Sequence, residues 1–236
     1  MGELQQSDYR IRKLIGVLGL ALPFLLPIAA EGSLLASISH NYYLPLPSLV
    51  FIIILSTMAL FLISYKGYRI DGTGKKEYIS DDWITNIGGL AALIVVIVPT
   101  SCAGSANDII KALCDNESYP LLGHNDTLRN IIHLISAGVF LLAMGWMSAF
   151  KFTRGCEPGS KKYKFFKRCG YAVWGSIGIL VIYFALLEFL PNFKGFPYMV
   201  YLMETVAIVP FGISWLAKGK TMTYLKNFVT KMQRTN

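Results

Sequence analysis

The chain has 236 residues, of which 54% are hydrophobic and only 15% are charged, and its mean hydropathy is +0.49. This composition excludes an ordinary soluble domain, because such a domain could not bury so much apolar surface. The formal net charge is +8, but Lys and Arg lie between long apolar stretches and form no single basic face, so the charge does not indicate a nucleic acid partner.

Six apolar stretches are about as long as the roughly 17 to 25 residues that a helix needs to cross a bilayer. They cover residues 14–35, 48–65, 83–100, 130–152, 171–190 and 197–217. Stretches of this length without strand-like alternation indicate helices. We therefore expect one all-α domain over residues 1–236, a polytopic transmembrane helix bundle of about six spans.

The basic residues predict the orientation of these spans. Nineteen of the 22 Lys and Arg residues fall in the two terminal segments and in the second and fourth connections. They are Arg10, Arg12, Lys13, Lys66, Arg69, Lys75, Lys76, Lys151, Arg154, Lys161, Lys162, Lys164, Lys167, Arg168, Lys218, Lys220, Lys226, Lys231 and Arg234. Because short cytoplasmic loops are enriched in Lys and Arg, both termini are expected inside, in a plasma membrane or a bacterial inner membrane.

The first apolar stretch has a second interpretation. Basic residues precede it and Ala29-Ala30 follows its centre, a pattern that is also typical of a cleaved signal peptide. Cleavage would leave five spans. We favour a retained helix, because the apolar stretch continues to Leu34-Leu35.

The third connection, residues 101–129, carries features of an outer loop. Cys102 and Cys114 could close a disulfide in an oxidising compartment, or remain two free thiols. Asn116 and Asn125 each begin an Asn-x-Ser/Thr sequence and are candidate glycosylation sites in a host that glycosylates.

Polar residues gather in the outer half of the predicted bundle. Glu204 lies seven residues beyond Pro197, so it is expected about 10 Å below the outer boundary, and ionisable groups at such depths often mark sites. The candidate binding residues are Glu204, His133, Tyr42, Tyr43, Ser39 and His40. They could fasten helices together, or line an outward-facing cavity for a lipid headgroup or small solute.

A metal site would have to take its ligands from His40, His124, His133 and Glu204, and no two of these histidines have the helical spacing that makes a metal motif specific. Neither a cofactor nor a resident metal is predicted. The leading hypothesis is a non-enzymatic membrane protein that binds or moves a lipid or small solute. An intramembrane metal-dependent hydrolase and a structural membrane subunit are the alternatives.

Membrane lipids are the expected partners. The basic fourth connection, Lys161 to Arg168, is interleaved with Tyr163, Phe165 and Phe166 and could contact anionic headgroups at the cytoplasmic surface. The sequence does not indicate an oligomeric state.

Several segments resemble an uncharacterised family of small, chiefly bacterial multi-pass membrane proteins. They are residues 204–219, with the sequence ETVAIVPFGISWLAKG, Ser37-Ile38-Ser39, Tyr42-Tyr43, residues 64–68, and Asp81-Asp82-Trp83 followed by Asn86. In that family the tyrosine pair leads into an Arg-Asp pair, whereas Leu44-Pro45-Leu46-Pro47 stands here. The resemblance implies a six-helix membrane fold and a role for Glu204, but no activity.

Overall fold

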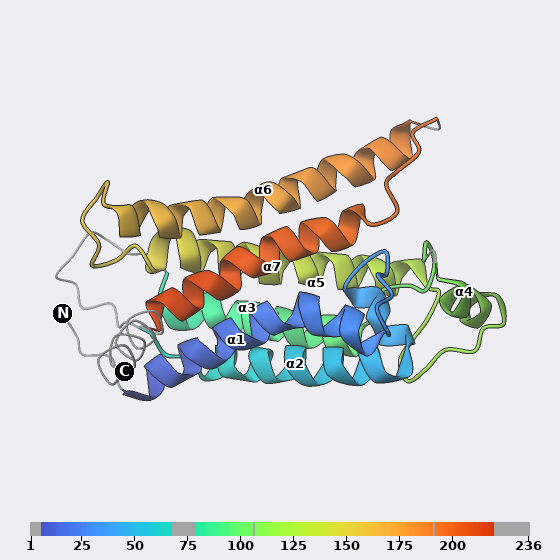
Figure 1. Cartoon of the computed structure of the whole chain (residues 1–236), viewed down its shortest axis with the longest axis horizontal. Helices are drawn as coiled ribbons and strands as arrows, with labels where there is room; N and C mark the ends of the chain where they lie inside the picture. Colours follow the sequence, from blue (N-terminus) through green and yellow to red (C-terminus); the bar gives the residue numbers. More distant parts are fainter. Residues whose placement is uncertain (1–5, 68–78, 106, 191, 220–236) are drawn as a thin grey trace, which may run out of the picture.

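The computed structural model describes residues 6–67, 79–105, 107–190 and 192–219. Over these ranges the chain is all-α, with seven α-helices and no strand (Figure 1). The α-helices are α1 (Gln6–Ala29), α2 (Pro45–Ser64), α3 (Asp81–Ile97), α4 (Asp108–Asp115), α5 (Thr127–Trp146), α6 (Lys161–Phe189) and α7 (Met199–Lys218). A short 3-10 helix, η1 (Ser39–Tyr43), precedes α2, and a π-helical turn, η2 (Met147–Lys151), extends α5.

The six long helices form a closed ring in chain order. Each packs on the next, from α1 through α2, α3, α5 and α6 to α7, and α7 returns to α1. Helix α4 lies apart from the ring at one end, while the start of α1 and the end of α7 lie at the other (Figure 1). We call the end with α4 the disulfide end, after the Cys102–Cys114 bond in its loop, and the other the basic end.

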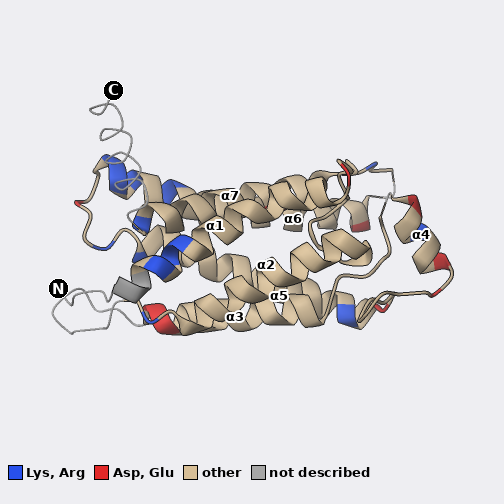
Figure 2. Ribbon diagram, turned by 60° about the horizontal axis from the view of Figure 1, so that its bottom comes forward, with Lys and Arg blue, Asp and Glu red and all other residues tan. Residues whose placement is uncertain are grey.

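Lys and Arg residues gather at the basic end (Figure 2). The other three basic residues belong to the disulfide end: Lys111 lies in α4, Arg129 in the first turn of α5, and Lys194 in the connection between α6 and α7. Seven of the basic residues counted in the sequence lie outside the described residues, namely Arg69, Lys75, Lys76, Lys220, Lys226, Lys231 and Arg234. The described part of the chain therefore has a strongly asymmetric distribution of basic residues along the bundle.

Five helical stretches are long and apolar enough to cross a membrane, as expected for a membrane protein. They are Tyr9–Ala29, Pro45–Ser64, Thr127–Lys151, Lys161–Phe189 and Met199–Lys218. Helix α3 has 17 residues, or about 26 Å at the rise of an α-helix, and is shorter than these five. The predicted all-α helix bundle is confirmed.

Several helix ends differ from the predicted spans, and two of them have a clear local cause. Helix α1 ends at Ala29 and not near position 35, because Glu31 and Gly32 adopt positive φ angles of 54° and 85°. The N–H of Gly32 donates to the carbonyl of Pro27 at 2.8 Å, a bond typical of a glycine-terminated helix. Helix α6 begins well before position 171, because the hydroxyl of Ser160 accepts the Tyr163 N–H and caps a first stretch that is basic.

Buried charges fasten the helices at the basic end. Arg12 is fully buried and its Nε donates to the hydroxyl of Tyr65 at 2.8 Å. Lys151 and Asp81 are both buried and form an ion pair at 3.6 Å. Breaking such a pair leaves one buried charge without its partner, which typically costs several kcal/mol. Arg12 and Lys151 are therefore part of the core and are not exposed surface charges.

Helices α1 and α7 approach closely because two glycines face each other. A methyl group added at Gly16 would lie 2.8 Å from the Gly212 carbonyl oxygen, and one at Gly212 would lie 3.0 Å from the Gly16 carbonyl oxygen. Small residues let membrane helices pack backbone against backbone. The contact that closes the ring therefore depends on the absence of side chains at this crossing.

Replacing Gly16 with valine should force α1 away from α7. We expect the free energy of unfolding to fall by about 1 to 3 kcal/mol, the usual cost of overpacking. Gly175→Val on α6 is the matched control, because a methyl group there meets no atom within 4 Å. Thermal unfolding in detergent, followed by far-ultraviolet circular dichroism, compares the two; equal stability of both variants would contradict this close approach.

Candidate functional site

The connection between α1 and α2 is buried at the disulfide end. Residues 37–44 are all buried, and only five of them form the short helix η1. We call residues 36–44 the buried segment. Its backbone groups lack the regular partners of a long helix and must find others inside the protein. The candidate site consists of this segment and the side chains that hold it.

Helix α7 binds the buried segment through Glu204 and Tyr201. The Glu204 carboxylate accepts the N–H of Ile38 at 2.7 Å, and the Tyr201 N–H donates to the carbonyl of Ala36 at 3.0 Å. The side chain of Ser37 also interacts with Glu204. Glu204 is a half-buried residue, and no Lys, Arg or His among the described residues forms an ion pair with it.

Tyr201 also completes the hydrogen bonding of α1. Pro27 has no N–H, so the carbonyl four residues before it, that of Pro23, lacks its usual helical donor. The Tyr201 hydroxyl donates to this carbonyl at 2.7 Å. Tyr201 and Glu204 are three residues apart, so they lie on the same face of α7. One face of α7 thus supplies hydrogen-bond partners to backbone groups of both α1 and the buried segment that follows it.

His133 joins α5 to the buried segment from the other side. Its Nδ1 lies 2.7 Å from the carbonyl of Val98, and its Nε2 lies 3.0 Å from the hydroxyl of Ser39. A carbonyl can only accept, so Nδ1 carries a proton, and in the neutral ring Nε2 accepts from Ser39. Both ring nitrogens are therefore used to tie α5, the end of α3 and the segment together.

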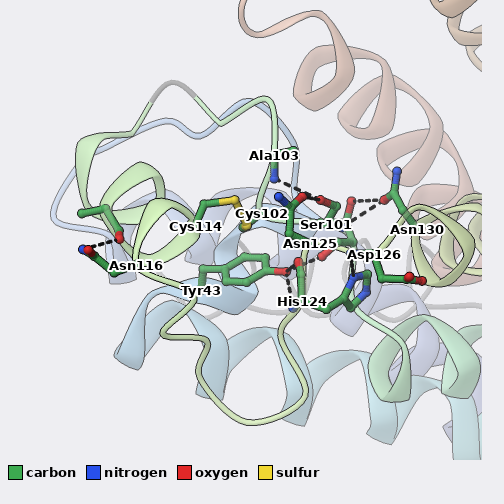
Figure 3. The surroundings of a disulfide bond; sticks show 12 residues. Tyr43, Ser101, Cys102, Ala103, Cys114, Asn116, His124, Asn125, Asp126 and Asn130 are labelled. Carbon is green, nitrogen blue, oxygen red and sulfur yellow. Dashed lines mark hydrogen bonds between the residues drawn. A yellow bond between two sulfur atoms is a disulfide. The ribbon is translucent and has the colours of Figure 1, made fainter.

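Tyr42 and Tyr43 link the buried segment to the long connection between α3 and α5. The Tyr43 hydroxyl donates to the carbonyl of Thr100 at 2.6 Å and accepts the N–H of His124 at 3.2 Å (Figure 3). The hydroxyl of Tyr42 accepts the Leu122 N–H at 3.2 Å. Burial raises the pKa of Tyr43, so its hydroxyl stays protonated and can donate.

Two further histidines lie near this connection. His124 uses Nε2 to donate to the carbonyl of Pro99 at 2.7 Å and Nδ1 to accept the N–H of Asp126 at 3.0 Å, as expected for a neutral ring. His40 is buried and neither ring nitrogen has a hydrogen-bond partner. Burial lowers the pKa of both rings, and at His124 the Pro99 carbonyl offsets part of this effect. Both histidines are therefore neutral at physiological pH.

The six predicted binding residues do not form one metal site: Ser39 and His133 contact each other, while the ring nitrogens of His40 have no hydrogen-bond partner. In the described part of the chain, no group of three or more His, Cys, Asp or Glu side chains could hold a metal ion. An open hollow of about 570 Å³ lies at the disulfide end, beside Cys102 and Cys114, with Lys111, Asp115 and Asn125 among its lining residues. None of the six predicted residues lines this hollow.

The disulfide closes the loop that carries α4. Cys102 and Cys114 are bonded, with their Cα atoms 5.7 Å apart (Figure 3). The two candidate glycosylation residues lie close by: Asn116 is exposed at the end of α4, and Asn125 is exposed and accepts the Ser101 hydroxyl at 2.8 Å. The loop packs on the buried segment through Tyr43, so the disulfide stabilises one wall of the candidate site.

The comparisons with known proteins give no family for this chain. No family model, no curated protein and no solved structure matches it. The class of the protein therefore follows from its own helices.

Sequence reasoning missed Tyr201 and the backbone partners of the site. Tyr201 could have been found from its spacing of three residues before Glu204 and from the carbonyl that Pro27 leaves without a donor. The carbonyls of Val98 and Thr100 carry no side-chain signal, so their pairing with His133 and Tyr43 required the structure.

Removing the disulfide should loosen the loop that covers the buried segment. The bond joins cysteines 12 residues apart, and closing a loop of that size is worth about 3 kcal/mol in the unfolded chain. We expect Cys102→Ser/Cys114→Ser to lose up to that amount of stability in denaturant unfolding. Cys156→Ser, which removes a free and partly buried thiol, is the control and should change little. Equal effects of the two variants would contradict a stabilising bond.

Proposed function

We propose that the protein crosses the membrane six times with both termini on the cytoplasmic side. Helix α3 supplies the sixth span, because it packs between α2 and α5 in the ring (Figure 1). An even number of spans agrees with the start of α1 and the end of α7 lying at the same end of the bundle. The asymmetry of Lys and Arg favours the cytoplasm for the basic end and the outside for the disulfide end.

We further propose that the disulfide end holds an outward-facing polar site that binds a lipid or small solute with a cationic group. The observation that supports this most is the state of Glu204. Its carboxylate belongs to a half-buried residue in the outer part of α7 and hydrogen-bonds to a backbone N–H where an ion pair would be expected. A charge in a membrane span is costly without a counter-ion, and such residues usually mark a site.

A cationic ligand would complete the environment of Glu204. The N–H of Ile38 occupies one carboxylate oxygen, and no basic side chain of the described residues neutralises the charge. An ammonium group would supply both charge and donors. Because Glu204 holds the buried segment, ligand binding there would also affect the residues that lead into α2.

The structural-subunit hypothesis remains the second candidate, and one observation favours it. Both ring nitrogens of His133 and the hydroxyl of Tyr43 are already hydrogen-bonded within the protein. These residues fasten helices and offer a ligand no free polar atom. The metal-dependent hydrolase finds less support, since the described residues contain no group of three candidate ligands.

The orientation predicts opposite labelling of two cysteines. In intact cells a membrane-impermeant maleimide should label a protein that keeps only Cys114, in the loop at the disulfide end. A protein that keeps only Cys156, in the turn at the basic end, should be labelled only after permeabilisation. The reverse pattern would contradict the proposed orientation.

Charge removal at Glu204 should abolish binding of a cationic probe. Choline at ten times its dissociation constant would stabilise a binding protein by about 1.4 kcal/mol, and its uncharged isostere 3,3-dimethylbutanol should not. In Glu204→Gln the amide oxygen can still accept the Ile38 N–H, so we expect the fold to remain and the choline effect to vanish. Thermal unfolding of the detergent-purified protein measures both. If wild type responds to neither compound and Glu204→Gln is equally stable, the structural role is favoured.

A further inference from the structure

A second surface feature lies at the basic end and is independent of the Glu204 site. Exposed or half-exposed basic and aromatic side chains cover the start of α6 and the adjoining end of α5 and η2. We call them the basic–aromatic patch; its members are Lys161, Lys162, Lys164, Lys167 and Arg168 with Trp146, Phe150, Tyr171 and Trp174.

The rings of the patch pack together and hold one of its cations. The Phe150 ring centroid lies 4.7 Å from that of Trp146 and 5.7 Å from that of Trp174. The Lys167 ammonium group lies 4.0 Å from the Phe150 centroid and 5.6 Å from that of Tyr171. Such cation–π contacts orient the ammonium group beside the rings. The patch is therefore a defined surface and not a set of independent side chains.

The length of α6 places this patch at the level of lipid headgroups. Its 29 residues extend about 43 Å, whereas the hydrocarbon core of a bilayer is about 30 Å thick. The stretch from Tyr171 to Phe189 alone covers about 28 Å. If this stretch spans the hydrocarbon, the preceding turns with Lys161 to Arg168 extend into the headgroup region, and Tyr171 lies at the boundary where aromatic residues are enriched.

Helical spacing places basic residues of the headgroup region and Tyr171 at the hydrocarbon boundary on one face of α6. Lys164, Arg168 and Tyr171 are separated by four and three residues, so their side chains follow one another along the same side of α6. All three are exposed. A phospholipid beside α6 could thus meet basic groups with its phosphate and the tyrosine ring with its glycerol region.

The charge of the patch identifies the occupant. No acidic residue occurs between Lys161 and Trp174, and among the described residues no carboxylate forms an ion pair with the five basic side chains. A soluble acidic partner could use these charges but would leave the exposed rings, which continue into an apolar span, without contact. We propose that the basic–aromatic patch is a docking surface for the headgroup of an anionic phospholipid in the adjacent leaflet.

Fluorescence quenching tests this docking directly. The full chain, in a Trp83→Phe background, is reconstituted in phosphatidylcholine vesicles with equal minor fractions of brominated phosphatidylglycerol or brominated phosphatidylcholine. Trp146 and Trp174 then report contact with brominated lipid, because Trp215 is fully buried. We expect stronger quenching by the anionic lipid, and a loss of about fivefold in this preference for each basic side chain removed, as in Lys164→Gln/Arg168→Gln.

Two further variants test whether the lipid preference depends on charge at the patch, and not on the total charge of the protein or on misfolding. Lys164→Arg/Arg168→Lys keeps both charges and should keep the preference. Lys111→Gln/Lys194→Gln removes two exposed charges at the disulfide end and should also keep it. The proposal is overturned if the wild type shows no preference for phosphatidylglycerol, if the charge-keeping variant loses it, or if the disulfide-end variant loses it to the same extent.

Discussion

The disulfide end of this bundle depends on one constraint: backbone donors and acceptors that lie away from water must be paired inside the protein. The buried segment interrupts the helices at this level, and partners come from both sides of the ring. Glu204 accepts the N–H of Ile38, and His133 contacts Ser39. Side chains that would be costly alone in lipid thus become the supports of an irregular turn.

The sequence predicted the helices better than their ends. Hydropathy detects long apolar stretches, and the all-α bundle follows from their number and length. Hydropathy cannot detect that α6 begins in a basic stretch. Lys161 to Arg168 are largely polar, but they are helical, and Ser160 caps their first turn. Nor does it show that α1 stops at Ala29, since the positive φ angles of Glu31 and Gly32 are a local backbone property.

The candidate site was predictable only through its ionisable side chains. Glu204 and His133 are unusual within apolar stretches, so composition and depth single them out. Their partners are mostly backbone groups, such as the N–H of Ile38 and the carbonyl of Val98, which no sequence pattern marks. At the other end, Arg12 and Lys151 were interpreted as topology signals, because a basic residue near a span has the same sequence pattern whether it is solvated or buried.

The bond between the Tyr201 hydroxyl and the Pro23 carbonyl has a consequence for biogenesis. It joins residues 178 positions apart, and the Glu204–Ile38 bond spans 166. During synthesis α1 is made with a carbonyl that its own helix cannot satisfy, and the partner of that carbonyl is translated only with α7. A nascent chain halted before α7 would therefore expose an incomplete first helix and an unanchored turn, features by which quality control could distinguish it from the finished protein.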